Sequence, residues 1–278
     1  MMKFSAAAVL FAAVLNAGSL PANPTLEQGY RQMYNLQFGD AHNTFRAWQS
    51  LHPADPMAPV SDAAAYLFSE FDRLHILQSE FFTDDQDFKS RKRGAPDPAV
   101  KKAFQDRLAE ADRLADTALV RSAGDQNAEF AKILADGLRS DYLALIEKRY
   151  VASLSFMKTG RAMAEALLAK NPSYYDAYLA VGVENYMLGL KAAPVRWLLG
   201  MAGAETDKRQ GIAKLKLTAE KGHYLLPFAR LLLAVAALRD EDKNTARTLL
   251  GGLTREFPQN PLYAKELARL SEAPSAAN

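Results

Sequence analysis

The 278-residue sequence contains no cysteine, and this absence excludes several kinds of chemistry at once. Disulfides, cysteine-ligated zinc and thiol nucleophiles are excluded, as is a lipid-modified cysteine at the N-terminus of an exported protein. A chain without thiols also suits an oxidising compartment, where a free thiol is a liability. Long apolar runs are missing as well, since no segment after the N-terminus reaches about 18 consecutive apolar residues. We therefore expect no transmembrane span in the mature chain.

The net charge of the chain is small, and histidine is rare. The 34 Lys and Arg residues nearly balance the 32 Asp and Glu residues, for a net charge of +2, so nucleic acid is not expected as a partner. None of the four histidines has another at i+4, and no His-Glu-x-x-His motif occurs. We predict no metal site and no cofactor, with His42 as a solvated side chain on an outer helix face.

Signals for nucleophilic catalysis and nucleotide binding are also missing. No serine lies in a Gly-x-Ser-x-Gly motif, and no glycine-rich phosphate loop occurs. Asp106, Glu110, Asp112 and Asp116 alternate with basic residues at one-turn spacing, which is typical of a solvated, salt-bridged helix face. We predict no catalytic residues. The alternative left open is a cell-wall glycan hydrolase with paired carboxylates from distant helices on the concave face.

The N-terminus has the form of an export signal. Met1–Lys3 is a short positive start, Phe4–Leu15 is an apolar run too short to span a bilayer, and Ala17–Ser19 offers small residues for cleavage. We predict a signal peptide over residues 1–19 and a periplasmic or secreted location. The alternative is an N-terminal membrane anchor or a frayed apolar helix.

Strand signals are nearly absent, whereas apolar residues recur at helical spacing through the chain. Ser61 and Asp62 are expected to cap one of the helices, and residues 83–98 to form an exposed loop. The pattern predicts about 11 to 13 helices. The main expected ranges are 26–36, 41–51, 63–82, 99–121, 127–150, 151–170, 176–190, 194–201, 207–221 and 261–270.

Gly29, Phe38, Ala41, Phe45 and Pro53 fall at the offsets of a helix–turn–helix repeat. A similar pattern lies near the C-terminus, in Leu233, Ala234, Ala246, Leu250, Leu253 and Pro258. The chain thus resembles the tetratricopeptide-repeat (TPR) superfamily over about residues 25–55 and 224–261, and partly over 160–190.

The first repeat departs from the pattern in having Thr25 where tryptophan is usual, and the last has Ala234 in place of glycine. The resemblance implies an all-α, right-handed helical-repeat (TPR-like) solenoid over residues 20–270. It also implies a concave groove that binds peptides or proteins. Pro172 does not fit the repeat spacing set by Pro53 and Pro258, which predicts an irregular centre, and residues 271–278 are expected to form a disordered tail.

We accordingly expect a non-catalytic exported scaffold that holds a peptide segment or partner protein in this groove. Aromatic side chains on the first helix of each repeat are the candidate contacts, although the same rings could instead pack between helices. Lys191–Leu199 is either a docking segment for a partner or a membrane surface, or a buried kink. The predicted partner-binding residues are Tyr30, Met33, Tyr34, Val183, Asn185, Tyr186, Met187, Lys191, Arg196 and Trp197.

Overall fold

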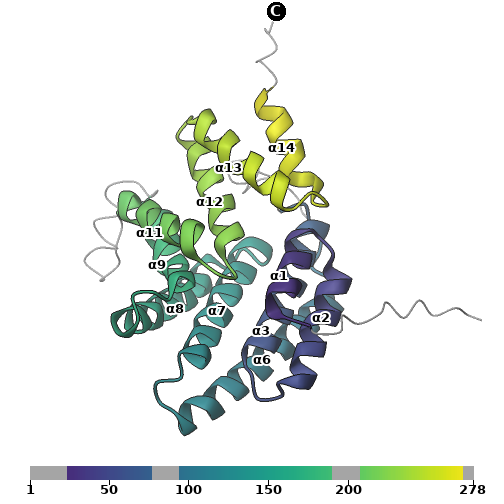
Figure 1. Ribbon diagram of the computed structural model, residues 1–278, viewed down its shortest axis with the longest axis vertical. Coiled ribbons are helices and arrows are strands. Elements are labelled where there is room, and N and C mark those ends of the chain that lie inside the picture. Colours follow the sequence, from purple (N-terminus) through teal and green to yellow (C-terminus); the bar gives the residue numbers. More distant parts are fainter. Residues whose placement is uncertain (1–23, 77–93, 190–206, 272–278) are drawn as a thin grey trace, which may run out of the picture.

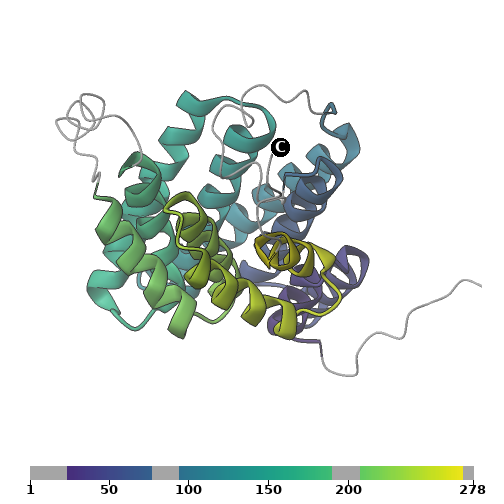
Figure 2. The ribbon, with the colours of Figure 1, turned by 90° about the horizontal axis from the view of Figure 1, so that it is seen from above.

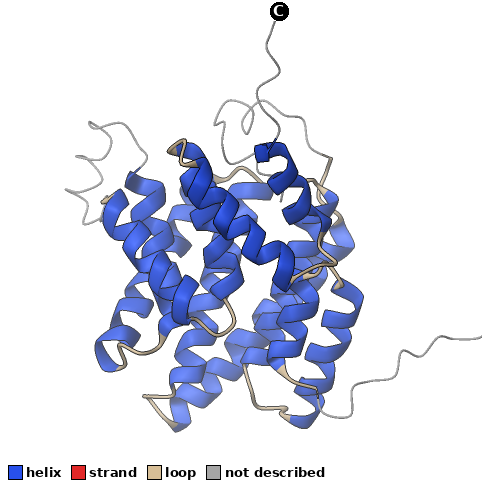
Figure 3. Ribbon diagram, turned by 45° about the horizontal axis from the view of Figure 1, so that its top comes forward, coloured by secondary structure: helices blue, strands red, loops and turns tan. Residues whose placement is uncertain are grey.

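The computed structural model describes residues 24–76, 94–189 and 207–271, and the regular structure in these ranges is helical throughout (Figure 3). This confirms the all-α prediction for the described chain. Successive helices pack as antiparallel neighbours (Figure 1). The eleven α-helices of these ranges are α1 (Leu26–Tyr34), α2 (Phe38–Leu51), α3 (Met57–Arg73), α6 (Pro98–Arg121), α7 (Gln126–Asp141), α8 (Tyr150–Lys170), α9 (Tyr178–Gly189), α11 (Lys208–Lys221), α12 (Leu226–Arg239), α13 (Lys243–Glu256) and α14 (Pro261–Ser271).

Two short helical turns interrupt the regular pattern. A π-helical turn, η1 (Tyr142–Ile146), extends α7, and a 3-10 turn, η2 (Tyr175–Ala177), precedes α9. The single helix expected over 127–150 is therefore divided. The helical conformation ends before Lys148, whose φ of 56° lies in the left-handed region that a continuing α-helix does not use. The calls on residues 1–19, 83–93 and 194–201 lie outside the described residues.

Side-chain caps fix where many of the helices begin. Thr25, Asp97, Asp125, Asp207 and Asp242 each accept a backbone N–H from the first turn of the helix that follows. Such caps satisfy donors that the helix itself leaves unpaired. These starts agree with the sequence-based helix ranges to within a few residues.

The cap predicted at Ser61 and Asp62 is wrong. Helix α3 begins at Met57, whose N–H donates to the Asp55 carboxylate at 2.9 Å, and the buried Val60 lies in its first turn. Ser61 and Asp62 therefore lie inside the helix, with 0% and 1% of their surface exposed. The apolar residues before Ser61 can be buried, so the helix begins at Met57, six residues before the start at residue 63 that the capping pattern indicates.

Glycines permit two close helix crossings. A Cβ on Gly29 would lie 2.3 Å from the Phe45 ring, so the absence of a side chain at Gly29 allows α1 and α2 to approach closely. The second crossing joins α9 to α11, where a Cβ on Gly211 would lie 2.5 Å from the Tyr186 backbone nitrogen and 2.9 Å from the Gly182 carbonyl oxygen. Backbone thus contacts backbone, and only glycine fits there.

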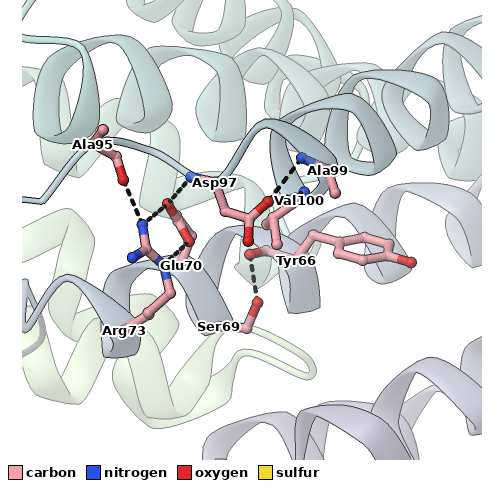
Figure 4. Close-up of polar contacts among 8 residues, drawn as sticks. All are labelled: Tyr66, Ser69, Glu70, Arg73, Ala95, Asp97, Ala99 and Val100. Atoms are coloured by element: carbon pink, nitrogen blue, oxygen red, sulfur yellow. Dashed lines mark hydrogen bonds and ion pairs between the residues drawn. The ribbon is translucent and has the colours of Figure 1, made fainter.

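A buried carboxylate joins the end of α3 to the start of α6 (Figure 4). Glu70 is 2% exposed and accepts two hydrogen bonds from Arg73, at 2.8 and 2.7 Å, and one from the Asp97 N–H at 2.9 Å. Arg73 also donates to the Ala95 carbonyl at 2.7 Å. The charge of Glu70 is therefore fully compensated, and its role is to fix the two helices.

The first helix contacts the last part of the described chain (Figures 1 and 2). The Asn260 side chain donates to the Tyr34 carbonyl at 2.9 Å, and the Gln259 N–H donates to the Asn35 side chain at 3.1 Å. Tyr34 donates its hydroxyl proton to the Tyr224 carbonyl at 3.0 Å. The C-terminal region thus satisfies groups that α1 leaves open at its own end.

These contacts close the array at its two ends. An open solenoid contacts only successive neighbours, whereas here hydrogen bonds join residues more than 180 positions apart, for example the 226 between Tyr34 and Asn260. The sequential pairing is consistent with a helical-repeat arrangement. The right-handed solenoid stays a prediction, and we call the contacts of α1 with residues 224–260 the end closure.

Candidate functional site

A cavity of about 260 Å³ lies in the middle of the array, with wall residues from helices between α3 and α14. Most of the wall is apolar, and Phe156, Met157 and Val183 are partly exposed there, so the cavity communicates with solvent. Gly137, on α7, has no atom within 4 Å of the position that a Cβ would occupy. This glycine therefore faces open space, and a side chain placed there would extend into the cavity.

Several polar groups of the wall already have structural partners. Asp176 accepts three backbone N–H groups, from His223, Tyr224 and Leu225, at 2.9 to 3.1 Å. It thereby fixes the turn before α12. Burial nevertheless raises the Asp176 pKa, against the lowering effect of those hydrogen bonds. Glu266 lies 3.3 Å from Arg269.

Ser140 and Ser153 share a hydrogen bond of 2.9 Å between α7 and α8. Both hydroxyls are buried in the cavity wall. The neighbouring Gly137 and Gly160, which also line the cavity, carry no side chain.

Asp141 is the exception among the carboxylates of the wall. It is the last residue of α7, it is partly exposed, and it makes no side-chain hydrogen bond or ion pair within the described chain. Burial raises its pKa to about 7, because the apolar surroundings disfavour the ionised form. A carboxylate in such surroundings is a candidate ligand-binding group.

The predicted partner-binding residues fall into three groups. Tyr30, Met33 and Tyr34 are 3%, 1% and 3% exposed and belong to the hydrophobic core. The Tyr30 ring, for example, lies 4.9 Å from Tyr224 and 5.5 Å from Phe45, centroid to centroid. These rings pack between helices, and burial raises the pKa of both tyrosines. They have no surface to offer a partner in this structure.

The second group comes from α9, where Val183 and Tyr186 line the cavity. Asn185, between them, is completely buried. The calls on the Met187 side chain and on Lys191, Arg196 and Trp197 lie outside the described residues. Sequence reasoning missed Gly137 and Asp141, for which the only available signal was an isolated glycine and an acidic residue within an apolar helical pattern.

The prediction for His42 is wrong. Its side chain is 14% exposed, and Nδ1 lies 2.5 Å from Oδ1 of Asp62. The other Asp62 oxygen lies 3.7 Å from Arg46 Nε and 3.5 Å from Arg107 Nε. The buried Asp62 carboxylate thus gathers basic groups from α2 and α6, and the cluster joins three helices. The acidic residues of α6, in contrast, form the predicted salt-bridged face, as in the pairing of Glu110 with Arg113 at 2.8 Å.

Two further kinds of site are absent from the described part of the chain. None of its helices combines the length and the hydropathy that a bilayer crossing requires. Within the same residues, no three His, Asp or Glu side chains are grouped so that they could hold a metal ion.

Fold and site together define an all-helical protein of sequentially paired helices around a mainly apolar cavity. No family model, curated protein or solved structure matches the chain.

Proposed function

We propose that this chain is a non-catalytic binding protein that receives apolar side chains of a partner polypeptide in its central cavity. The observation that carries the proposal is the cavity itself: about 260 Å³ of mainly apolar space, with an open position at Gly137. Folded proteins close-pack their interiors, so an unfilled apolar space of this size is a natural site for a ligand.

The volume favours anchoring side chains over a complete small molecule. Small-molecule sites usually enclose about 300–1,000 Å³, and an apolar cavity of about 150 Å³ holds one benzene ring. By that measure the 260 Å³ available here would take between one and two groups of ring size. Pockets that receive a few aromatic or aliphatic anchors are typical of protein–protein recognition.

The energetics indicate that the cavity is one part of a larger contact. Burying an apolar side chain contributes about 1.5–3 kcal/mol, so two anchors supply roughly 3–6 kcal/mol. Association costs about 4–15 kcal/mol in lost freedom of motion. The partner must therefore also contact the rim of the cavity, as an amphipathic segment lying across the helices would.

The glycan-hydrolase alternative requires two carboxyl groups that are free to act on the substrate. Of the cavity carboxylates in the described chain, Asp176 is held by three N–H groups and Glu266 lies beside Arg269. That leaves Asp141 as a single candidate, which favours binding over hydrolysis. We further propose export, which N-terminal sequencing of the mature protein from its native host would test.

A cavity-filling variant tests the binding proposal. Gly137→Leu places a side chain in the cavity, whereas Gly252→Leu makes the same change at a position of α13 where no atom lies within 4 Å of the new Cβ. Gly252 itself does not line the cavity. We expect a partner crosslinked to the native protein to be lost from Gly137→Leu and retained by Gly252→Leu. A partner retained by both variants would refute the assignment to the cavity.

A further inference from the structure

One helical face carries the cavity wall on both sides of Asp141. Gly137, Ser140, Asp141, Ala144 and Leu145 all line the cavity, at positions i, i+3, i+4, i+7 and i+8. This is the spacing of a single helix face, and it continues from α7 into η1. Asp141 is therefore the one charged residue of an otherwise small and apolar face.

Folding alone gives no reason for a carboxylate at this position. Placing a charge in apolar surroundings without a partner is costly, and replacing it with a neutral residue is commonly neutral or stabilising. Local features that disfavour folding are typical of functional positions. The π-helical turn that begins at Tyr142, directly after Asp141, also indicates a functional position, since such turns are frequent at functional sites.

The other titratable and charged groups of the wall lie on different elements. They are Asp176 on η2, Tyr186 on α9, Arg239 on α12, and Tyr263 and Glu266 on α14. The residues that α3, α8, α11 and α13 contribute to the wall are all uncharged. Arg239 does not form an ion pair with Asp141 in the described chain, since no cationic nitrogen lies within 4.0 Å of that carboxylate.

We infer that the partner segment carries a basic side chain beside its apolar anchors, and that Asp141 receives it. This inference rests on the proposed function. An ammonium or guanidinium group would compensate the carboxylate in surroundings of low dielectric constant, where a charge pair is strong. An acidic segment would bring like charges together and be rejected, so the same group also gives specificity.

The carboxyl group must be ionised to pair with a cation, which makes the binding depend on pH. With a pKa of about 7, Asp141 is mostly protonated near pH 6 and mostly ionised near pH 8. The ionised fraction rises about tenfold between these values, and the affinity for a basic segment rises with it. An uncharged segment shows no such rise.

Three short peptides test the inference. They share one amphipathic leucine pattern and carry lysine, glutamine or glutamate at the flanking positions. Fluorescence anisotropy measures their binding to the native chain, to Asp141→Asn and to Asp106→Asn. The last variant removes the same charge from an exposed residue of α6 outside the cavity. We expect the lysine peptide to bind the native chain most tightly, and about fivefold more tightly at pH 8 than at pH 6, because the protonated form keeps the weaker affinity of its apolar anchors.

Asp141→Asn should weaken lysine-peptide binding about tenfold at pH 8 and abolish the pH dependence, whereas Asp106→Asn should leave both unchanged. Equal binding of the lysine and glutamate peptides to the native chain would overturn the basic-segment inference while leaving cavity binding intact. Binding that Gly137→Leu does not reduce, or no binding of any peptide, would overturn the proposed function itself. Circular dichroism confirms that each variant is folded.

Discussion

The crossing of α9 and α11 gives the sharpest prediction about stability. A Cβ on Gly211 would lie 2.5 Å from the Tyr186 nitrogen and 2.9 Å from the Gly182 oxygen. Both obstacles are backbone atoms, so no side-chain rotation relieves the clash. In Gly211→Ala, α9 must move by roughly 1 Å before the contact at Tyr186 reaches an ordinary van der Waals distance, and this repacking is expected to cost about 1–3 kcal/mol.

A second effect opposes that cost. Alanine is favoured over glycine inside a helix by about 0.5–1 kcal/mol. We therefore expect Gly211→Ala to lower the free energy of unfolding by about 1–2 kcal/mol. Gly252→Ala is the matched control in α13, where a Cβ meets nothing within 4 Å. It should raise the free energy of unfolding by about 0.5–1 kcal/mol, because helix propensity acts alone.

Urea unfolding followed by circular dichroism measures both variants. The midpoints should move in opposite directions at a similar m-value, and Tm should move by about 2–4 °C for each kcal/mol in a chain of this size. A Gly211→Ala protein as stable as the native one would refute the argument. So would a destabilised Gly252→Ala. Because Val183 and Tyr186 lie on the helix that moves, Gly211→Ala should also weaken peptide binding.

Three other substitutions test polar side chains that contact or face the interior of the protein. Asp62→Ala removes the shared partner of three basic side chains and should cost about 3–5 kcal/mol in urea unfolding. Tyr34→Phe leaves the Tyr224 carbonyl without its donor at the end closure, and the same assay should show a loss of about 1–2 kcal/mol. Asp141→Asn should change the pH dependence of Tm. Since burial raises the folded-state pKa of Asp141 to about 7, the stability that this group contributes is lost as pH rises from about 4 towards 8, and the variant should lack this contribution.

The sequence predicts local structure here better than it predicts the site. Gly29 and Phe45 are separated by the spacing of a repeat, and their contact follows from that spacing alone. Asp62 could not be placed in this way, because the residues that compensate its charge lie on two other helices. A capping pattern is local, whereas the compensation of a buried charge depends on the tertiary structure.

The same limit applies to the partner-binding residues. The repeat phase predicts which side of α1 bears Tyr30 and Tyr34, but the rings are covered by residues about 190 positions further along the chain. Asp141 has no motif to mark it. Only the packed helices around it show that a carboxylate faces apolar space, and that its pKa is raised as a result.

The end closure changes how such a helical array can unfold. In an open array the terminal helices can fray independently, since each is held on one side only. Here α1 is held from both sides, by α2 along the chain and by residues 224–260 across it, so releasing either end disrupts the other. Such a chain should unfold as one cooperative unit. Its folding should also be slow for a helical protein, because the last contacts to form join residues at opposite ends of the sequence.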